Sequence, residues 1–371
     1  MRVVYLCTSS LDYPSPRGRW LPMARQRVQA GDEPHLLLLH PTFDQLAPGA
    51  RHSLQAGVHI HYVGQMQVYG LPGHRRQFGR LQLMGVSLHS AWALARHALA
   101  LMPDELVLCK PQPVNSLAVL WAAGVSRRAF DVDCDDYEAG ANRFSAGWMG
   151  AMQRWLVRWC EDQVPRRARR MTVNTRFLYD RYRSLGIDET HLRRVPNTAH
   201  GISRPPADAV AQLQVDLGLE GRSVVAYVGT LSRVAHGVDL LLEAMPLVLK
   251  EVPDVRLLIV GDGDDREALQ QLAVYLEIAK IIVWCGSVPP KSVPLYFALA
   301  NCSVDPVYDT PAARGRSPLK IVESLAVGTP VVTGDVGDRV EMIGCEGVIV
   351  RPGDASQLAL GIVQLLKSRE G

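Results

Sequence analysis

The stretch Arg314–Val332 reads RGRSPLKIVESLAVGTPVV and contains a complete turn, helix and strand. Pro318 suits the first turn of a helix, and we expect Ser317 before it to act as the N-cap. Apolar residues then recur at helical spacing, which predicts a helix with one buried face. Gly328 is expected to close that helix, and TPVVT to begin a strand.

Lys320 and Glu323 lie three residues apart, so they share one side of the first helical turns. The free backbone N–H groups of the helix start, around Ser317, Pro318 and Leu319, add to them. Together these groups suit a ligand with phosphates and hydroxyls, such as a nucleotide sugar. The alternative is a capped helix whose Lys320 and Glu323 only face water.

The composition describes a soluble chain long enough for two ordinary domains. It has 371 residues, of which 47% are hydrophobic and 21% charged, and its net charge of +3 gives no reason to expect nucleic-acid binding. Its seven cysteines form no C-x-x-C pair, which indicates a reducing cytoplasm and no structural zinc. The start MRVVYL reads as a strand rather than a signal peptide.

Strand-like and helical runs alternate along the whole chain, with one break. The segment RVPNTAHGISRPPADA is rich in proline, glycine and small polar residues, as a linker is. We therefore predict an N-terminal domain over 1–195, a linker over 196–210 and a C-terminal domain over 211–371. The alternation favours two doubly wound parallel sheets, with ligands beyond the carboxyl ends of the strands and in an interdomain cleft.

Four segments resemble, in order, the retaining glycosyltransferases of family four, which have the GT-B fold of two Rossmann-like domains. They are PRRARRMTVNTRFLYDRYRSLG with RVPN, VVAYVGTLSRVAHGVDLLLEA, VRLLIVGDGDDREAL and ESLAVGTPVV. The resemblance implies transfer of a sugar from a UDP- or GDP-type donor to a glycan, lipid-linked or small-molecule acceptor. It implies retention of configuration, with no metal ion and no cofactor. Family members continue with a helix that crosses back to the N-terminal domain, whereas this chain stops at Gly371.

The resemblance also points to donor-site residues. Glu323 matches one family glutamate, whereas the position of the other is occupied by Gly315. The family's phosphate-binding arginine and lysine fall on Thr230 and His236. The predicted donor-binding residues are Gly229, Thr230, His236, Gly261, Ser317, Pro318, Leu319 and Glu323.

Arg233 and Lys320 are the predicted catalytic residues. Arg233 lies in the loop Gly229–Gly237, and its forked guanidinium suits phosphate oxygens. Both cations are expected to stabilise the departing diphosphate in place of the missing arginine and lysine. The alternative for Arg233 is a solvated loop residue.

The run FDVDCDDYE (Phe130–Glu138) has aspartates at alternate positions, which invites a metal interpretation. Because Asp131 lies within a predicted strand and the surrounding sequence is of the GT-B type, we favour hydrogen bonds from the later carboxylates to sugar hydroxyls. Lys110, at another strand end, either attracts an anionic group or is a surface lysine. The predicted acceptor-side residues are Arg17, Gly18, Lys110, Asp135, Asp136 and Glu138.

Several other site classes are not indicated. None of the eleven histidines falls into H-x-x-x-H or H-E-x-x-H spacing, so the sequence predicts no metal site. G-x-S-x-G and P-loop motifs are absent, and no G-x-G-x-x-G follows the first strand. Two alternatives to a glycosyltransferase stay open: a nucleotide-sugar epimerase on the same fold, and a non-catalytic binding or scaffold protein.

The segment Trp148–Arg170 combines tryptophans on one helical face with several arginines. This composition suits a helix that lies on an anionic membrane surface, which would place the protein peripherally at the inner face of the membrane. The alternative is that the tryptophans pack against the sheet as part of the core.

Overall fold

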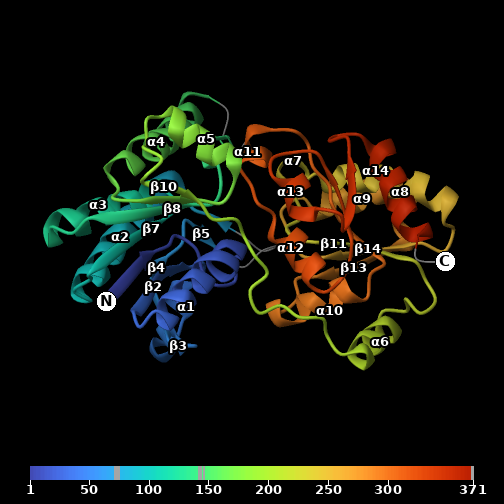
Figure 1. The fold of residues 1–371 in the computed structure, drawn as a ribbon, viewed down its shortest axis with the longest axis horizontal. Helices are drawn as coiled ribbons and strands as arrows, with labels where there is room; N and C mark the ends of the chain where they lie inside the picture. The colour runs from blue at the N-terminus through green and yellow to red at the C-terminus, as the bar shows by residue number, and fades with distance from the viewer. Residues whose placement is uncertain (71–75, 141–143, 145–146, 369–371) are drawn as a thin grey trace. The chain divides into compact units, whose positions relative to one another are not determined.

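The computed structural model describes residues 1–70, 76–140, 144 and 147–368. The chain divides into two compact units, Met1–Asn197 and Thr198–Gly371, and each is built around a parallel sheet (Figure 1). The boundary falls inside the segment predicted as a linker. Helix α6 (Ala207–Asp216) also starts within that segment, so the second unit begins before the predicted residue 211.

The sheet of the first unit has the strand order β10-β9-β8-β7-β1-β2-β4-β3 and is parallel except for the β3–β4 pair. Its strands are β1 (Arg2–Leu6), β2 (Glu33–His40), β3 (His52–Gln55), β4 (Val58–Gln65), β7 (Glu105–Cys109), β8 (Phe130–Cys134), β9 (Met171–Val173) and β10 (Leu192–Arg194). A separate short hairpin joins β5 (Val68–Tyr69) to β6 (Arg76–Gln77). The helices are α1 (Leu21–Gln29), α2 (Arg80–Ala100), α3 (Pro113–Ser126), α4 (Trp148–Gln163) and α5 (Arg176–Ser184).

The leucine run of β2 shows why this sheet is covered on both faces. Successive strand residues point to opposite faces, and Leu36 and Leu38 pack with the core around α1. Leu37 and Leu39 pack instead with the core around α2 and α3. A run of consecutive apolar residues therefore predicts a doubly covered parallel strand correctly here.

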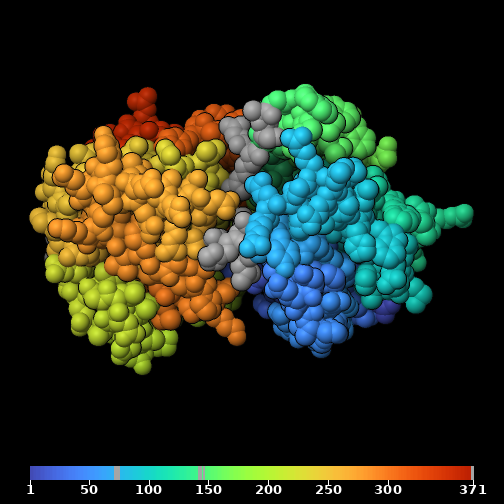
Figure 2. Space-filling view, turned by 180° about the vertical axis from the view of Figure 1, so that it is seen from behind, coloured from blue at the N-terminus to red at the C-terminus, as the bar shows by residue number. Residues whose placement is uncertain are grey.

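The sheet of the second unit has the order β13-β12-β11-β14-β15-β16, and its strands pair in parallel. The strands are β11 (Val224–Val228), β12 (Arg256–Val260), β13 (Ile282–Gly286), β14 (Cys302–Asp305), β15 (Val331–Gly334) and β16 (Gly347–Val350). The helices after α6 are α7 (Arg233–His236), α8 (Val238–Glu251), α9 (Arg266–Tyr275), α10 (Val293–Ala298), α11 (Pro311–Arg314), α12 (Leu319–Ala326), α13 (Arg339–Ile343) and α14 (Ala355–Lys367). Helix α6, yellow-green in Figure 2, lies at the surface of this unit and has no fully buried residue.

The turn, helix and strand predicted for Arg314–Val332 are present as α12 and β15. Gly328 closes α12 with a φ of +80° and donates its N–H to the Leu325 carbonyl at 2.9 Å. The predicted N-cap is wrong by one residue. Pro318 occupies the cap position, no side chain caps the helix, and the Ser317 hydroxyl contacts the sulfur of Met342 instead.

The tryptophans of α4 are not core residues, so that alternative is wrong. Trp148 is 75% exposed and Trp155 62%, and Met152, Leu156 and Trp159 also stand largely in solvent. The helix is anchored to its unit through the opposite side, by buried Cys160 and Glu161. Within the described part of the chain, no helix combines the length and the apolar character that crossing a membrane requires.

Candidate functional site

The second unit brings two loops together at the point where its strand order reverses. Strand β11 pairs on one side with β12, the next strand along the chain, and on the other side with β14. Such a switch point separates the loops that follow the two central strands, and in doubly wound sheets it is where ligands bind. Here these loops begin at Gly229, after β11, and at Pro306, after β14.

Three glycines let the loops after β11 and β12 lie directly against each other. A Cβ atom at Gly261 would lie 1.9 Å from the Gly229 carbonyl oxygen, and one at Gly263 would lie 2.2 Å from the Leu231 carbonyl oxygen. Gly261 also has a φ of +133°, which other residues rarely adopt. The predicted donor-site residues Gly229 and Gly261 are therefore in direct backbone contact.

Lys320 of α12 reaches this glycine loop. A Cβ atom at Gly229 would lie 3.3 Å from Nζ of Lys320, and the ammonium lies 4.3 Å from the centre of the Tyr227 ring. The Lys320 side chain is only 12% exposed, so the expectation that it merely faces water is wrong. The ammonium is therefore a largely buried charge beside the glycine loop.

Asp305, the last residue of β14, holds Lys320 in place. Its Oδ1 lies 3.3 Å from Nζ of Lys320, and its Oδ2 accepts a 2.8 Å hydrogen bond from Nε of Arg339. Thr333 of β15 donates its hydroxyl to the same carboxylate. Burial by itself raises the pKa of Asp305, but Arg339 and Lys320 outweigh burial and hold that pKa well below its ordinary value. The carboxylate is therefore charged at neutral pH.

Other cations gather around the same carboxylate. His236, predicted to bind the donor, lies close enough to Asp305 to lower the pKa of its carboxyl further. Arg316 donates from Nη1 to the Ala235 carbonyl at 2.6 Å and is near enough to Lys320 to help lower the pKa of its ammonium, an effect dominated by burial. Arg316, Asp305 and Arg339 were not among the residues predicted from the sequence. Asp305 could have been predicted from the segment CSVDPV, in which a charged residue ends an apolar strand.

Arg233 begins α7, whose N-cap Ser232 accepts from the Ala235 N–H. The Arg233 side chain is 53% exposed, and its Nε lies 3.7 Å from a carboxylate oxygen of Asp239. The backbone carbonyl of Thr230, a predicted donor-site residue, accepts a 2.8 Å hydrogen bond from the Tyr227 hydroxyl. Arg233 is thus more exposed than Lys320.

The remaining predicted donor residues line the start of α12. Ser317 and Pro318 are buried, whereas Leu319 and Glu323 are half-buried. Glu323 follows Lys320 by about one helical turn, so the two side chains emerge from neighbouring positions of α12.

In the first unit, four of the six predicted acceptor-side residues, Lys110, Asp135, Asp136 and Glu138, form one ion cluster. Nζ of Lys110 lies 3.3 Å from Asp135, 2.6 Å from Asp136 and 3.2 Å from Glu138. The surface-lysine alternative is wrong, because the Lys110 side chain is only 12% exposed and its backbone adopts a left-handed φ of +60°. Burial raises the pKa of Asp135 to about 6, although Lys110 opposes this shift.

The other aspartates of FDVDCDDYE also pair with cations. Asp131 accepts two hydrogen bonds from Arg169. Asp133 is buried and accepts from Nε and Nη2 of Arg19 at 2.6 and 2.7 Å, and from Trp20. Since cationic side chains neutralise these carboxylates, the arrangement gives no support to the metal interpretation of the run.

Arg17 and Gly18 lie in a π-helical turn, Pro16–Trp20, that leads into α1. Both are half-buried, and the turn is fixed by Arg19 rather than by either of them. Arg19 also donates from Nη1 to the Val195 carbonyl at 2.8 Å and to Asn197 at 3.0 Å. The Arg19–Asp133 pair was not predicted from the sequence.

Comparisons with known proteins agree with this architecture. Residues 222–368 match the family model described as Glycosyl transferases group 1. A Mycolicibacterium smegmatis protein named GDP-mannose-dependent alpha-(1-6)-phosphatidylinositol monomannoside mannosyltransferase is 30% identical over 242 residues, which cover 62% of this chain and 62% of that protein. The phosphatidyl-myo-inositol mannosyltransferase of Mycobacterium leprae is 35% identical over 147 residues, or 39% of this chain and 37% of its own length. The matches thus span less than two thirds of these relatives.

Solved structures match along the whole chain. Sucrose-phosphate synthase from Thermosynechococcus elongatus superposes with a TM-score of 0.74 at 18% identity, covering 100% of this chain and 91% of that one. Anabaena HepE in complex with UDP and glucose gives a TM-score of 0.72 at 17% identity, with the same coverage. At such identities the likeness establishes the fold, GT-B, in agreement with the prediction. Residues 222–368, which lie in the second unit, are thus similar to the Glycosyl transferases group 1 family.

Proposed function

We propose that this protein transfers a sugar from a nucleotide-sugar donor to an acceptor, with retention of configuration and without a metal ion. The observation that carries the proposal is the ammonium of Lys320. It is buried beside the Gly229 backbone at the switch point of the second sheet, and its charged partner there is Asp305, at 3.3 Å. A buried donor group in that position suits the diphosphate of a nucleotide sugar.

The chemistry follows from the charges around that position. When the bond between the sugar and the diphosphate breaks, negative charge grows on the diphosphate oxygens. Lys320, held by Asp305, stabilises that charge without having to reorganise, and Arg233 and Arg316 add to the positive potential. The acceptor hydroxyl forms the new glycosidic bond and passes its proton to the departing diphosphate. Glu323 accepts hydrogen bonds from the ribose hydroxyls.

The relatives support a nucleotide-sugar donor but differ in the base. The name of the Mycolicibacterium protein specifies GDP-mannose, whereas the Anabaena structure contains UDP and glucose. For this chain we propose a UDP- or GDP-type donor and leave the base to experiment.

We further propose a lipid-linked acceptor reached at an anionic membrane surface. Both mycobacterial relatives are named for phosphatidylinositol-type lipids. The exposed face of α4 presents Trp148, Met152, Trp155 and Trp159, and exposed Arg166, Arg167 and Arg170 follow the helix. Aromatic and apolar side chains insert at the interface, while each arginine near an anionic surface contributes about 1 kcal/mol, screened by salt.

Purified protein incubated with a panel of UDP- and GDP-sugars tests the donor proposal. We expect one donor to raise the melting temperature and to be hydrolysed slowly without an acceptor, with no loss of activity in EDTA. An epimerase would instead convert the sugar of that donor and release no free diphosphate. A donor that binds without either reaction would identify a binding protein, and activity restored only by added manganese would refute metal independence.

Flotation with vesicles tests the membrane proposal. Binding to vesicles with an anionic lipid, lost at high salt and in a Trp155→Ser/Trp159→Ser variant, is the expected result. Leu81→Ser, on the exposed side of α2, is the matched control and should bind like the wild type. Equal binding to anionic and neutral vesicles, or none, would contradict the proposal.

A further inference from the structure

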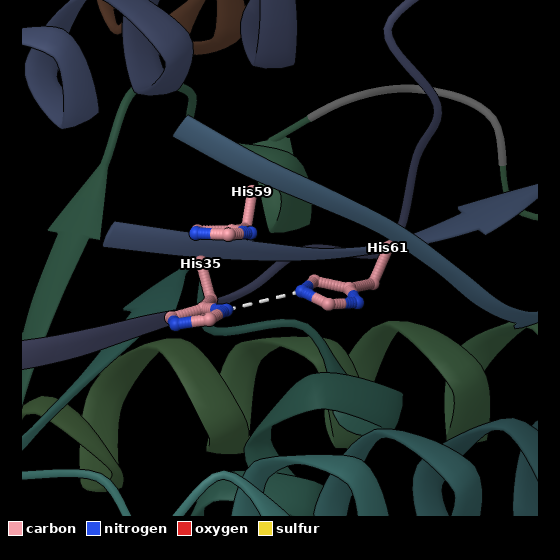
Figure 3. A group of neighbouring side chains, drawn as sticks. All are labelled: His35, His59 and His61. Atoms are coloured by element: carbon pink, nitrogen blue, oxygen red, sulfur yellow. Dashed lines mark hydrogen bonds between the residues drawn. The ribbon is translucent and has the colours of Figure 1, made fainter. Parts of the chain in front are cut away.

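Histidines from three neighbouring strands meet at one edge of the first sheet. His35 lies on β2, and His59 and His61 lie on β4 (Figure 3). The parallel register places His35 opposite His59. His59 and His61 are two residues apart, so their side chains share a face of the sheet. One ring nitrogen from each residue lies within 4.8 Å of the corresponding nitrogens of the other two.

A fourth histidine comes from the edge strand. His52 on β3 is the antiparallel partner of His61, and its ring centre lies 4.6 Å from that of His61. Its Nε2 lies 3.4 Å from Nδ1 of His59. The short strand β3 therefore completes a ring of imidazoles on one side of the sheet.

The ring nitrogens of this cluster lie close enough together for one metal ion to replace the contacts between them. Nδ1 of His35 and Nε2 of His61 are hydrogen-bonded at 3.0 Å, so one of the two nitrogens carries a proton that a bound metal ion would replace. Two zinc-bound nitrogens at tetrahedral angles, each about 2.0–2.1 Å from the ion, are roughly 3.4 Å apart. A small movement of the side chains would bring the donors to that spacing.

Glu33 supplies the outer partner that metal-binding histidines ordinarily have. Its Oε1 lies 3.1 Å from Nε2 of His35, so that nitrogen donates to the carboxylate and the lone pair stays on Nδ1, which faces His61. This carboxylate–histidine arrangement fixes the tautomer that binds a metal ion.

We propose that His35, His59 and His61, with His52 as fourth ligand, bind one Zn²⁺ ion or a similar divalent transition ion. The imidazole-only donor set favours zinc, copper or nickel over magnesium or calcium, which prefer oxygen ligands. The inference is independent of the proposed function.

The position in the fold gives the ion a structural role. His35 and His59 lie near the starts of β2 and β4, whereas the ligand loops follow the carboxyl ends of parallel strands. A bound ion would tie the short, solvent-exposed strand β3 to β4 and β2. It would not take part in sugar transfer, so metal-independent catalysis and a metal-stabilised fold are compatible.

The test uses the full chain prepared without a polyhistidine tag, in a Cys345→Ser background to remove the exposed thiol. Titration with Co²⁺ should give the visible absorption bands of a tetrahedral nitrogen site at one ion per chain. Zn²⁺ should displace the cobalt and raise the melting temperature.

Substitutions distinguish the metal-binding residues from residues that do not bind the ion. His59→Ala and His61→Ala should each abolish the cobalt bands, and Glu33→Gln should weaken binding about 10- to 100-fold while keeping the bands. The exposed His191→Ala is the matched control and should bind like the background protein. Circular dichroism without metal shows whether each variant is folded. Absence of tetrahedral cobalt bands in the background protein, or bands unchanged in the folded His59→Ala/His61→Ala double variant, would overturn the proposal.

Discussion

Lys320 and Asp305 form an ion pair in which Nζ and Oδ1 lie 3.3 Å apart, and both side chains are largely removed from solvent, being 12% and 4% exposed. Lys320 lies in the first turn of α12 and Asp305 ends β14, so the pair connects two elements at the switch point. The second oxygen of Asp305 pairs with Arg339 at 2.8 Å. A carboxylate at this place therefore fixes a cation that would otherwise be costly to bury, and leaves that cation able to meet a ligand.

Asp305→Asn should destabilise the protein strongly. The substitution leaves Arg339 and Lys320 buried without a compensating charge, and breaking a buried pair in this way costs about 3–5 kcal/mol. Urea unfolding of the two proteins at neutral pH measures the difference. Asp309→Asn, which removes an exposed partner of Arg314, is the control and should leave the midpoint nearly unchanged. An Asp305→Asn midpoint equal to that of the control would show that the pair is not structural.

Gly261→Ala should disrupt the glycine loops of the second unit. The added methyl group would meet the Gly229 carbonyl at 1.9 Å, too close for either backbone to stay in place, and the φ of +133° adds strain. We expect a lower melting temperature and weaker nucleotide binding. Gly124→Ala in α3, where a Cβ meets nothing within 4 Å, should instead stabilise the protein by up to about 1 kcal/mol. Unchanged nucleotide affinity in Gly261→Ala would separate the loop from the donor site.

The fold was predictable from the sequence because its signals are local. Four consecutive buried leucines in β2 and the helix from Leu319 to Ala326 depend on neighbouring residues alone. The contacts between strands were not predictable in the same way. Asp305 meets Arg339, and His35 meets His59, only because the sheets adopt particular strand orders and registers. A search limited to helical histidine spacing overlooks H-x-H on a strand, where alternate residues share a face.

For the α4 tryptophans, the sequence pattern predicts the helix but not what its apolar face contacts. An amphipathic helix has the same pattern whether its apolar face meets a sheet or a membrane. The pattern of Trp148, Trp155 and Trp159 therefore left both alternatives open, and their exposure rules out the first.

The pH dependence of stability should carry a contribution from Glu161. Burial raises the pKa of its carboxyl from 4.5 to about 7, although the N–H groups of Glu138 and Ala139 donate to it. Between these values the folded chain keeps a proton that the unfolded chain has released. Stability should therefore fall as the pH rises from about 4.5 to about 7, by an amount on the order of 3 kcal/mol, and level off above.

Urea midpoints across that pH range, compared between the wild type and Glu161→Gln, isolate this contribution. Asp135, with a raised pKa of about 6, contributes with the same sign in both proteins and cancels in the difference. Parallel pH profiles for the two proteins would mean that Glu161 is ionised when folded, with its charge satisfied by the two backbone donors.

Lys320 and Glu323 should show separable roles in nucleotide binding. In the proposed function, the Lys320 ammonium meets phosphate oxygens and Glu323 accepts hydrogen bonds from the ribose. A hydrogen bond to a charged group is worth about 1.5–3 kcal/mol, which corresponds to roughly 10- to 150-fold in affinity. Lys320→Ala should weaken binding of the nucleoside diphosphate by that order and hardly affect the nucleoside. Glu323→Ala should weaken both ligands alike, because both contain the ribose.

Calorimetric titration of both ligands against both variants distinguishes these patterns. Glu277→Ala, in the turn after α9, serves as a control for loss of a carboxylate elsewhere in the same unit. Lys320→Ala removes one partner of Asp305, so its folded fraction must be measured first, and Lys320→Arg keeps the charge as a second variant. If Glu323→Ala binds the diphosphate as tightly as the wild type, the residue is only a carboxylate on the surface of α12, and the assignment of the ribose subsite fails. If Lys320→Ala weakens the nucleoside as much as the diphosphate, its effect comes from disturbing Asp305 and Gly229 rather than from contact with phosphate.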